Sequence, residues 1–235
     1  MGLPRLSNFS GGSFKHVDVD LGYSDLQVRE DNGRKYETPD GSKYPSMTTV
    51  LSHLGKDGLE AWRARVGDKE ANKVGKQAAN RGTTVHNLME AYINGEEIST
   101  RGMMPHHLKS LKSMSKILDE NLEEVWAQEA ALYSHHLGVA GRVDLVGVWK
   151  GVPAIIDFKT SRKVKKKEWI DSYFMQTAGY AICFEERTGL PVPNLVILMD
   201  IDNHDPVVFL EHRDNWVGPL KDAIKEYHRL ERCKA

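Results

Sequence analysis

Short apolar runs in the second half of the chain predict a buried sheet. The segment 138–147 has valine and leucine on both sides of Asp144 and is bounded by glycines, and Val152 to Phe158 repeats that pattern around Asp157. The intervening Trp149-Lys150-Gly151 has the length of a hairpin turn, so we expect these two strands to be antiparallel. Further strands are expected at 125–133, 194–201 and 207–210.

Apolar residues spaced by three and four predict helices on either side of this sheet. We expect them at Leu59–Asn94, Pro105–Glu120, Lys165–Arg187 and Asn215–Leu230. A short helix before them would be capped by Ser46, Thr48 or Thr49, following a turn at Asp40-Gly41. If the helix from Leu59 is continuous, one face carries a basic stripe, which is either a solvated face or a DNA contact; its members are Arg65, Lys69, Lys73 and Lys76.

This order of elements predicts an α/β fold with a mixed central β-sheet flanked by helices and an N-terminal helical region. A chain of 235 residues is long enough for one such domain. Residues 1–35 are rich in Gly, Ser and Asp and are expected to form an N-terminal arm. The remaining 36–235 would be a single domain, divided into a helical part at 46–122, a sheet core at 125–211 and a C-terminal helix at 213–233.

Composition narrows the class of protein only slightly. The formal net charge of −1 argues neither for nor against nucleic acid, so only local clusters of charge are informative. Cys183 and Cys233 have no metal-binding spacing, which predicts a reducing intracellular compartment and excludes a four-cysteine iron–sulfur cluster. No apolar run is long enough for a membrane span, so we expect a cytoplasmic protein without a membrane partner.

The candidate chemistry lies in the predicted hairpin. Asp144 and Asp157 would each place a carboxylate in a buried strand, and Lys159 follows the second acid by two residues. Buried acids are unfavourable unless they are paired or hold a cation. Two such carboxylates beside one ammonium group therefore indicate a metal site with a fixed positive charge next to it.

The pattern Asp144…Asp157-Phe158-Lys159 resembles the D…(D/E)-x-K signature of the PD-(D/E)XK nucleases, and the string 156–161, Ile-Asp-Phe-Lys-Thr-Ser, resembles their RecB-type branch. That branch includes the mitochondrial genome maintenance exonuclease and phage exonucleases. The resemblance covers about residues 36–210 and implies a restriction-endonuclease-like core. A phage-encoded origin would suit so short a member of the branch.

Two helical motifs extend the resemblance. Arg81-Gly-Thr-Thr-Val-His86 resembles the G-x-x-x-H helix of the branch, and Gln176-Thr-Ala-Gly-Tyr180 resembles its Q-x-x-x-Y motif. The first of these implies that His86 is a metal ligand. Glu90 shares its helix face and is either a further ligand or a solvated residue. Glu129 has an acidic counterpart in many members, but it is equally compatible with a solvent-facing strand position.

The resemblance also implies roles for the site residues. Asp144, Asp157, His86 and the Phe158 carbonyl would bind one or two Mg²⁺ or Mn²⁺ ions, for which oxygen ligands and one imidazole are suitable. Lys159 would orient the water nucleophile or hold the phosphate, and Gln176 and Tyr180 would position the lysine or the strand. The basic run after this motif is expected to contact the DNA backbone, with hydrogen bonds from two hydroxyls; these residues are Thr160, Ser161, Arg162, Lys163, Lys165, Lys166 and Lys167.

We therefore expect a metal-dependent DNA exonuclease that hydrolyses phosphodiester bonds on single-stranded or frayed ends. Two alternatives stay open at this point. One is a structure-specific endonuclease, and the other is a catalytically silent DNA-binding or recombination module of the same fold. The sequence specifies neither the cleavage polarity nor whether a helicase, recombinase or replication protein is a partner.

Overall fold

A computed structural model describes residues 8–30 and 33–233 of the chain. The predicted N-terminal arm therefore lies partly outside the described residues. Its described part contains three short strands, β1 (Asn8–Phe9), β2 (Lys15–His16) and β3 (Gln27–Arg29). All three pair with strands from elsewhere in the chain, so this segment lies against the rest of the molecule. The boundary predicted at residue 35 stays a prediction.

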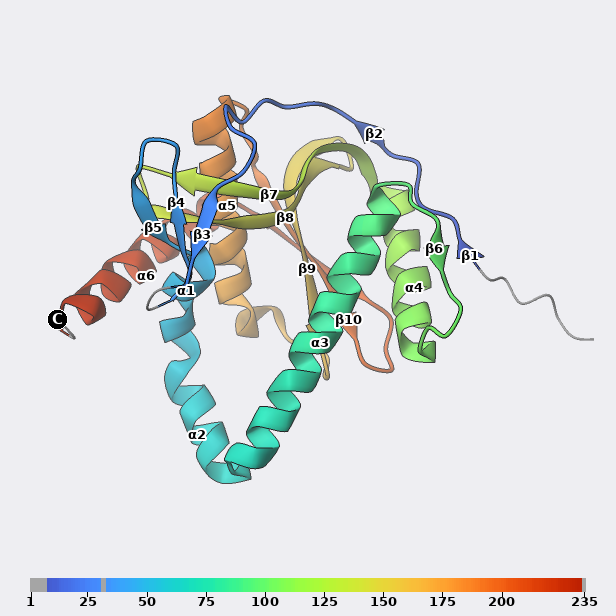
Figure 1. Cartoon of the computed structure of the whole chain (residues 1–235), viewed down its shortest axis with the longest axis horizontal. Coiled ribbons are helices and arrows are strands. Elements are labelled where there is room, and N and C mark those ends of the chain that lie inside the picture. The colour runs from blue at the N-terminus through green and yellow to red at the C-terminus, as the bar shows by residue number, and fades with distance from the viewer. Residues whose placement is uncertain (1–7, 31–32, 234–235) are drawn as a thin grey trace, which may run out of the picture.

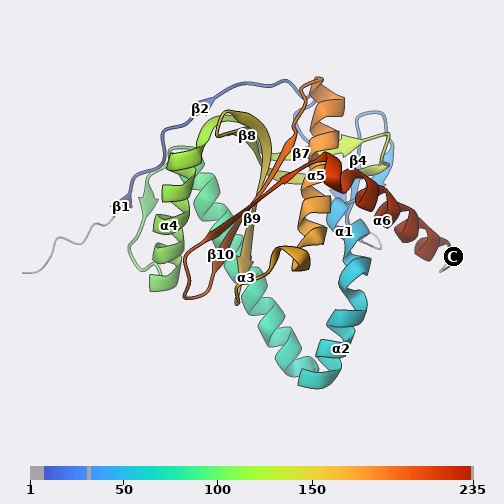
Figure 2. The same cartoon turned by 180° about the vertical axis from the view of Figure 1, so that it is seen from behind.

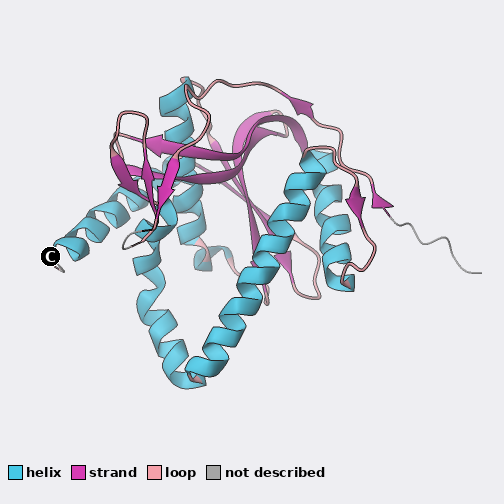
Figure 3. Cartoon of the chain, in the orientation of Figure 1, coloured by secondary structure: helices cyan, strands magenta, loops and turns pink. Residues whose placement is uncertain are grey.

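The central sheet has the strand order β11-β10-β9-β8-β7-β2. Its long members are β7 (Leu122–Ser134), β8 (Val139–Trp149), β9 (Val152–Ser161), β10 (Asn194–Ile201) and β11 (Val207–His212). Strand β9 pairs in parallel with β10 and antiparallel with β8, and the remaining pairs include both directions. The predicted mixed sheet flanked by helices is therefore confirmed (Figure 3).

Helices cover both faces of this sheet (Figures 1 and 2). On one face, α3 (Asp68–Ile93) and α4 (Pro105–Asn121) pack against a core that includes Met89, Leu111 and Phe158. On the other, α5 (Asp171–Thr188) packs on the sheet and is flanked by α1 (Met47–Leu51) and α6 (Asp214–Arg232). Phe174 of α5 stacks on Trp216 of α6, with ring centroids 5.1 Å apart. Two apolar cores thus hold the sheet between them.

Two small sheets complete the structure. Strand β1 pairs with β6 (Ile98–Ser99), and β3 forms a meander with β4 (Lys35–Glu37) and β5 (Lys43–Pro45). The turn at Asp40-Gly41 connects β4 to β5, as expected. Ser46 caps α1 by accepting a hydrogen bond from the Thr49 backbone N–H, which confirms one of the three predicted caps.

Two predicted helices are broken where the sequence pattern runs on. The first, predicted over Leu59–Asn94, is divided into α2 (Lys56–Val66) and α3 because Gly67 has φ +82°, and a 3₁₀ turn (Ser52–Gly55) precedes α2. Arg65 and Lys69 thus belong to different helices, and the expected basic stripe is interrupted between them. The helix predicted from Lys165 begins only at Asp171, after a 3₁₀ turn at Lys167–Trp169. Among the described residues, none of the helices combines the length and apolar character of a membrane span.

The hairpin that carries the two acids forms as predicted. Register pairs run from Trp149↔Val152 to Leu145↔Ile156, and Lys150 and Gly151 make the turn with φ +51° and +77°. Positive φ at both central residues matches the twist of a two-residue hairpin. Strand β7 extends this sheet through irregularities at Leu122/Glu124 and Val125/Ala127.

A pair of glycine substitutions tests this packing. A Cβ at Gly147 would lie 2.1 Å from the Glu124 carbonyl oxygen of the neighbouring strand, whereas a Cβ at Gly75 in α3 meets nothing. We expect Gly147→Ala to lower the free energy of unfolding by several kcal/mol, because two backbones must separate. Gly75→Ala should raise it by about 0.5–1 kcal/mol. Urea unfolding monitored by circular dichroism measures both, and equal effects would contradict this register.

Candidate metal centre

Three carboxylates form a row across three adjacent strands. The β7–β8 register pairs Gln128 with Leu145 and Ala130 with Val143, so Glu129 lies opposite Asp144. The β8–β9 register ends at Leu145↔Ile156, and its continuation places Asp157 beside Asp144. Because opposite residues on neighbouring strands point to the same face, the three acids approach one another.

Helix α3 brings His86 to this row. Its Nδ1 lies 3.5 Å from Oδ2 of Asp144, and its ring meets Phe158 edge to face at 6.1 Å. One ligand atom from each of His86, Glu129 and Asp144 lies within 4.8 Å of the other two. These three side chains are therefore placed to hold a metal ion. The structure brings the predicted His86 and Asp144 together and adds Glu129, a half-buried strand residue whose carboxylate lies beside them.

Asp157 differs from the other two acids in its surroundings. Its side chain is 1% exposed and forms an ion pair with the Lys159 ammonium group. Burial raises the pKa of Asp157 to about 6, while Lys159 opposes and Asp144 reinforces this shift. Burial alone would lower the pKa of Lys159, but the Asp157 and Asp144 carboxylates raise it. Lys159 is thus a fixed positive charge beside the acids, as the sequence predicted.

Asp144 is held by the backbone of the next strand. Its Oδ2 accepts a hydrogen bond of 2.8 Å from the Phe158 N–H, at the point where the register pairs between β8 and β9 end. Burial would raise the pKa of Asp144, but the hydrogen bond and charge of His86 lower it. The contact that Phe158 makes here is through its N–H, and metal binding by its carbonyl stays a prediction.

Glu129 occupies an unusual backbone conformation for a strand residue. Its φ of +46° lies in the left-handed region, which is strained for a residue with a side chain. Burial raises the pKa of Glu129 to about 7, and the negative charges of Asp144 and Glu90 add to this shift. Arg142 donates a hydrogen bond to the Glu129 carbonyl and also pairs with Asp25. An ionic tether from the N-terminal segment therefore supports the strained residue.

The predicted glutamine and tyrosine lie on α5 over the other side of the site. Nε2 of Gln176 donates to the Tyr180 hydroxyl at 3.3 Å, and Tyr180 is 2% exposed. The Tyr180 ring lies against β8, where a Cβ added to Gly141 would be 2.9 Å from its hydroxyl. One turn earlier, the Tyr173 ring lies 5.2 Å from the Lys159 ammonium group. Gln176 and Tyr180 thus cover the α5 side of β8, the strand that carries Asp144.

The residues predicted to contact DNA are distributed over two environments. Thr160, Ser161 and Arg162 line a cavity on the α3 side of β9. Lys165 donates to the Tyr173 hydroxyl, Lys166 lies over the Trp169 ring, and Lys167 pairs with Glu211. Lys163 is exposed. Three of the four lysines therefore have a partner within the chain, and DNA contact by this run stays a prediction.

The residues present fit a divalent cation. Apart from the Lys159 ion pair, no described residue donates a hydrogen bond to the buried Asp157 carboxylate. Three neighbouring acids against one ammonium group leave an excess of negative charge, and the charges of Asp144 and Glu90 add to the burial that raises the pKa of Glu129. Carboxylate oxygens and one imidazole suit Mg²⁺ or Mn²⁺. His86, Glu129 and Asp144 would hold such an ion, and Asp157 lies next to them.

Sequence comparisons leave the family of this chain open. No model of a known protein family matches the sequence, and no curated protein matches it. Among solved structures, the fold has partial similarity to a crystal structure from Eubacterium rectale that is provisionally described as an exonuclease. The TM-score is 0.39 and the sequence identity 10%, over 81% of this chain and 69% of that one. Similarity at this level does not assign an activity.

Removing the Glu129 charge should alter how stability depends on pH. The folded protein binds this proton more tightly than the unfolded chain, because the pKa rises from 4.5 to about 7. The stabilisation is therefore complete below pH 4.5 and is lost as the pH rises through 7. Without metal, Glu129→Gln should melt about 2–4 °C above the parent protein at pH 8, after allowance for solvent screening, and the gap should close at pH 5. Calorimetry in EDTA measures this, and parallel pH profiles would contradict it.

The Arg142 tether should matter for metal affinity. Arg142→Ala removes the hydrogen bond that supports the Glu129 backbone, and loss of such outer contacts typically weakens metal binding by about 10–100-fold. Titration calorimetry with Mn²⁺ measures this change directly. Arg29→Ala, which breaks an ion pair with Glu37 in the small β3–β4–β5 sheet, is the matched control and should bind Mn²⁺ like the parent protein. Unchanged affinity in Arg142→Ala would show that the tether does not position Glu129.

Proposed function

We propose that the protein is a metal-dependent deoxyribonuclease, acting as an exonuclease on single-stranded or frayed DNA ends. The observation that carries this proposal is the row of Glu129, Asp144 and Asp157 with His86 above it and Lys159 beside it. Phosphodiester hydrolysis needs an activated water and positive charge near the phosphate. The clustered acids suit a cation, and Lys159 supplies the second requirement from the chain itself.

Each residue has a distinct part in the proposed reaction. A divalent cation bound at His86, Glu129 and Asp144 would activate water and offset the charge that develops on the phosphate. Lys159, held in place by Asp157, would donate to a non-bridging phosphate oxygen or orient the attacking water. Tyr173 and Tyr180 exclude bulk water from the α5 side, which strengthens the electrostatic interactions within the site.

A catalytically silent DNA-binding module is the main alternative of another class. Such a module would have no need to keep acids in unfavourable positions. Here Glu129 is strained and crowded by like charge, and Asp157 is buried with a single ionic partner. These unfavourable features support the enzyme over the silent module. An endonuclease would use the same centre, so the distinction from an exonuclease depends on the substrate.

Digestion of end-labelled linear DNA with Mg²⁺ or Mn²⁺ tests the proposal. Lys159→Ala and Asp157→Asn should each lower the cleavage rate by at least about 100-fold, because each removes a group at the reacting phosphate or its support. Lys225→Ala, at an exposed position on α6, is the matched control and should cleave at the parent rate. Melting curves for each variant separate loss of chemistry from loss of folding.

The outcomes distinguish the alternatives. Cleavage within threefold of the parent rate in both site variants would show that the centre lies elsewhere. A wild-type protein that binds Mn²⁺ but cleaves no DNA would be the silent module. Circular single-stranded DNA should stay intact, because an exonuclease needs an end, and its cleavage would indicate the endonuclease.

A further inference from the structure

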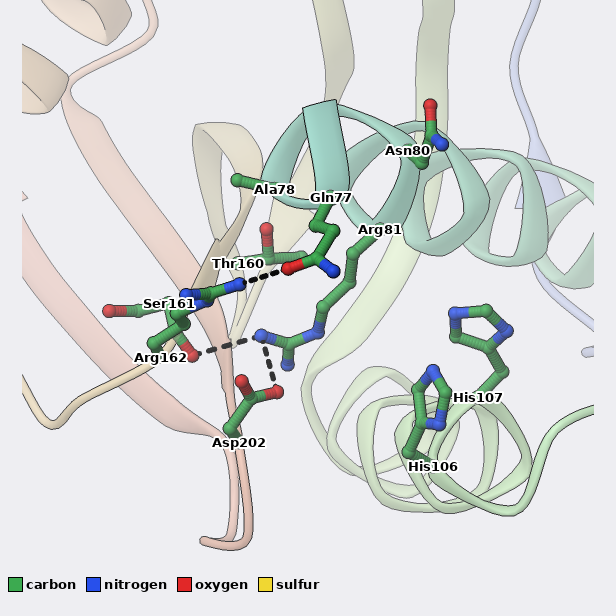
Figure 4. Close-up of a pocket in the computed structure, with 10 residues that line it drawn as sticks. All are labelled: Gln77, Ala78, Asn80, Arg81, His106, His107, Thr160, Ser161, Arg162 and Asp202. Atoms are coloured by element: carbon green, nitrogen blue, oxygen red, sulfur yellow. Dashed lines mark hydrogen bonds and ion pairs between the residues drawn. The ribbon is translucent and has the colours of Figure 1, made fainter. Parts of the chain in front are cut away.

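A cavity of about 470 Å³ lies next to the metal centre, between α3, α4 and the ends of β9 and β10. Figure 4 shows Gln77 and Arg81 entering it from α3, His106 and His107 from α4, and Arg162 with Asp202 closing the opposite side. Its volume falls within the range of about 300–1,000 Å³ for small-molecule sites. The roles proposed above for the metal centre do not use His106, His107 or Gln77.

The charges around this cavity balance. The Arg81 guanidinium group is paired with Asp200 and Asp202, at 2.5 and 2.7 Å, and it also donates to the Ser161 carbonyl. Arg162 donates to Gln77 and brings one further positive charge. Two arginines against two aspartates leave no excess of positive charge for a phosphate group. The cavity is therefore suited to a neutral polar ligand.

Its lining combines planar faces with hydrogen-bonding edges. The imidazoles of His106 and His107 have centroids 4.1 Å apart, and neither side chain has a hydrogen-bond partner among the described residues. Burial, His106 and Arg81 lower the pKa of His107, which favours the uncharged form of its ring. The Gln77 amide and the Thr160 hydroxyl add donors and acceptors. Nucleobases are recognised by such a combination of stacking and edge hydrogen bonds.

The cavity and the metal centre are both lined by residues of β9 and α3. Thr160, which lines the cavity, follows Lys159 on β9. Gly82, which precedes His86 by about one helical turn, approaches the Thr160 hydroxyl closely enough that an added Cβ would lie 3.8 Å from it. Side chains of consecutive strand residues point to opposite faces, so a DNA strand with one phosphate at Lys159 would pass the end of β9 to place a neighbouring base at Thr160.

We propose that this cavity binds the base of a nucleotide flanking the cleaved phosphate, with His106 and His107 stacking on it and Gln77 and Thr160 contacting its edge. The choice of a nucleobase as ligand rests on the proposed nuclease function. The cavity would hold the strand by one base while the neighbouring phosphate lies at the metal centre. Its donors and acceptors would also favour some bases over others at that position.

Binding of a fluorescein-labelled oligothymidylate in EDTA tests this without cleavage. A single abasic residue is moved through the strand, and anisotropy gives the affinity at each position. One position should show a loss of about tenfold, since a stacked base contributes on the order of that factor. In the double variant His106→Ala/His107→Ala, the intact strand should bind about tenfold more weakly and the abasic penalty should disappear. His228→Ala on α6 is the matched control and should retain the penalty.

Three results would overturn the inference: abasic strands that bind as well as intact ones, a penalty that persists in the double variant, or a wild-type protein that binds no oligonucleotide. If the double variant unfolds, His106→Ala alone gives the same comparison, because His106 is exposed. The outcome is independent of the proposed nuclease activity. If the protein shows the abasic penalty in EDTA but cleaves no DNA with Mg²⁺ or Mn²⁺, the base site would be supported and the nuclease function would be rejected.

Discussion

Repulsion among the carboxylates of Glu129, Asp144 and Asp157 is the constraint on which the centre of this structure depends. Removing an ion from water costs several kcal/mol even after the protein relaxes, and like charges in one row add to that cost. The structure offsets this cost in three ways. Lys159 forms an ion pair with Asp157, and Asp144 accepts a hydrogen bond from the Phe158 N–H and lies beside His86. The pKa of Glu129 is raised, which favours its uncharged form. The remaining imbalance makes the site receptive to a cation. The fold thus keeps three acids close together at a position where a bound cation would reduce their repulsion.

Helix α3 connects this centre to the rest of the molecule. Its buried residues Val85, Met89 and Ile93 pack against the sheet and fix the helix along β9. One turn of that helix then supplies His86 to the acids, while Arg81 ties it to the ends of β9 and β10 through Ser161 and Asp200. Asp200 is buried and also accepts a hydrogen bond from Ser110 of α4. The same packing therefore positions the proposed metal ligand and the neighbouring cavity.

Sequence reasoning succeeded where the signal is local. The hairpin around Lys150-Gly151 and the pairing of Asp157 with Lys159 follow from strand periodicity and a short turn. It could not place Glu129, because the β7 register depends on irregularities near Glu124 and Trp126 that have no sequence signature. Gly67 was the one signal for the break between α2 and α3, and apolar spacing continued across it. The Arg81–Asp200 contact joins distant segments, so no local pattern could reveal it.

Strand β9 is paired on both sides, with β8 for its first half and with β10 along most of its length. It carries Asp157, Lys159, Thr160 and Ser161 in consecutive or alternate positions, at a rise of about 3.3 Å per residue. Neither β8 nor β10 can shift its register against β9 without breaking backbone hydrogen bonds. Strand β9 therefore fixes the distance between the metal centre and the proposed base site. The distance between the bound base and the cleaved phosphodiester bond would then be set by the backbone of β9, and side-chain substitution alone could not change it.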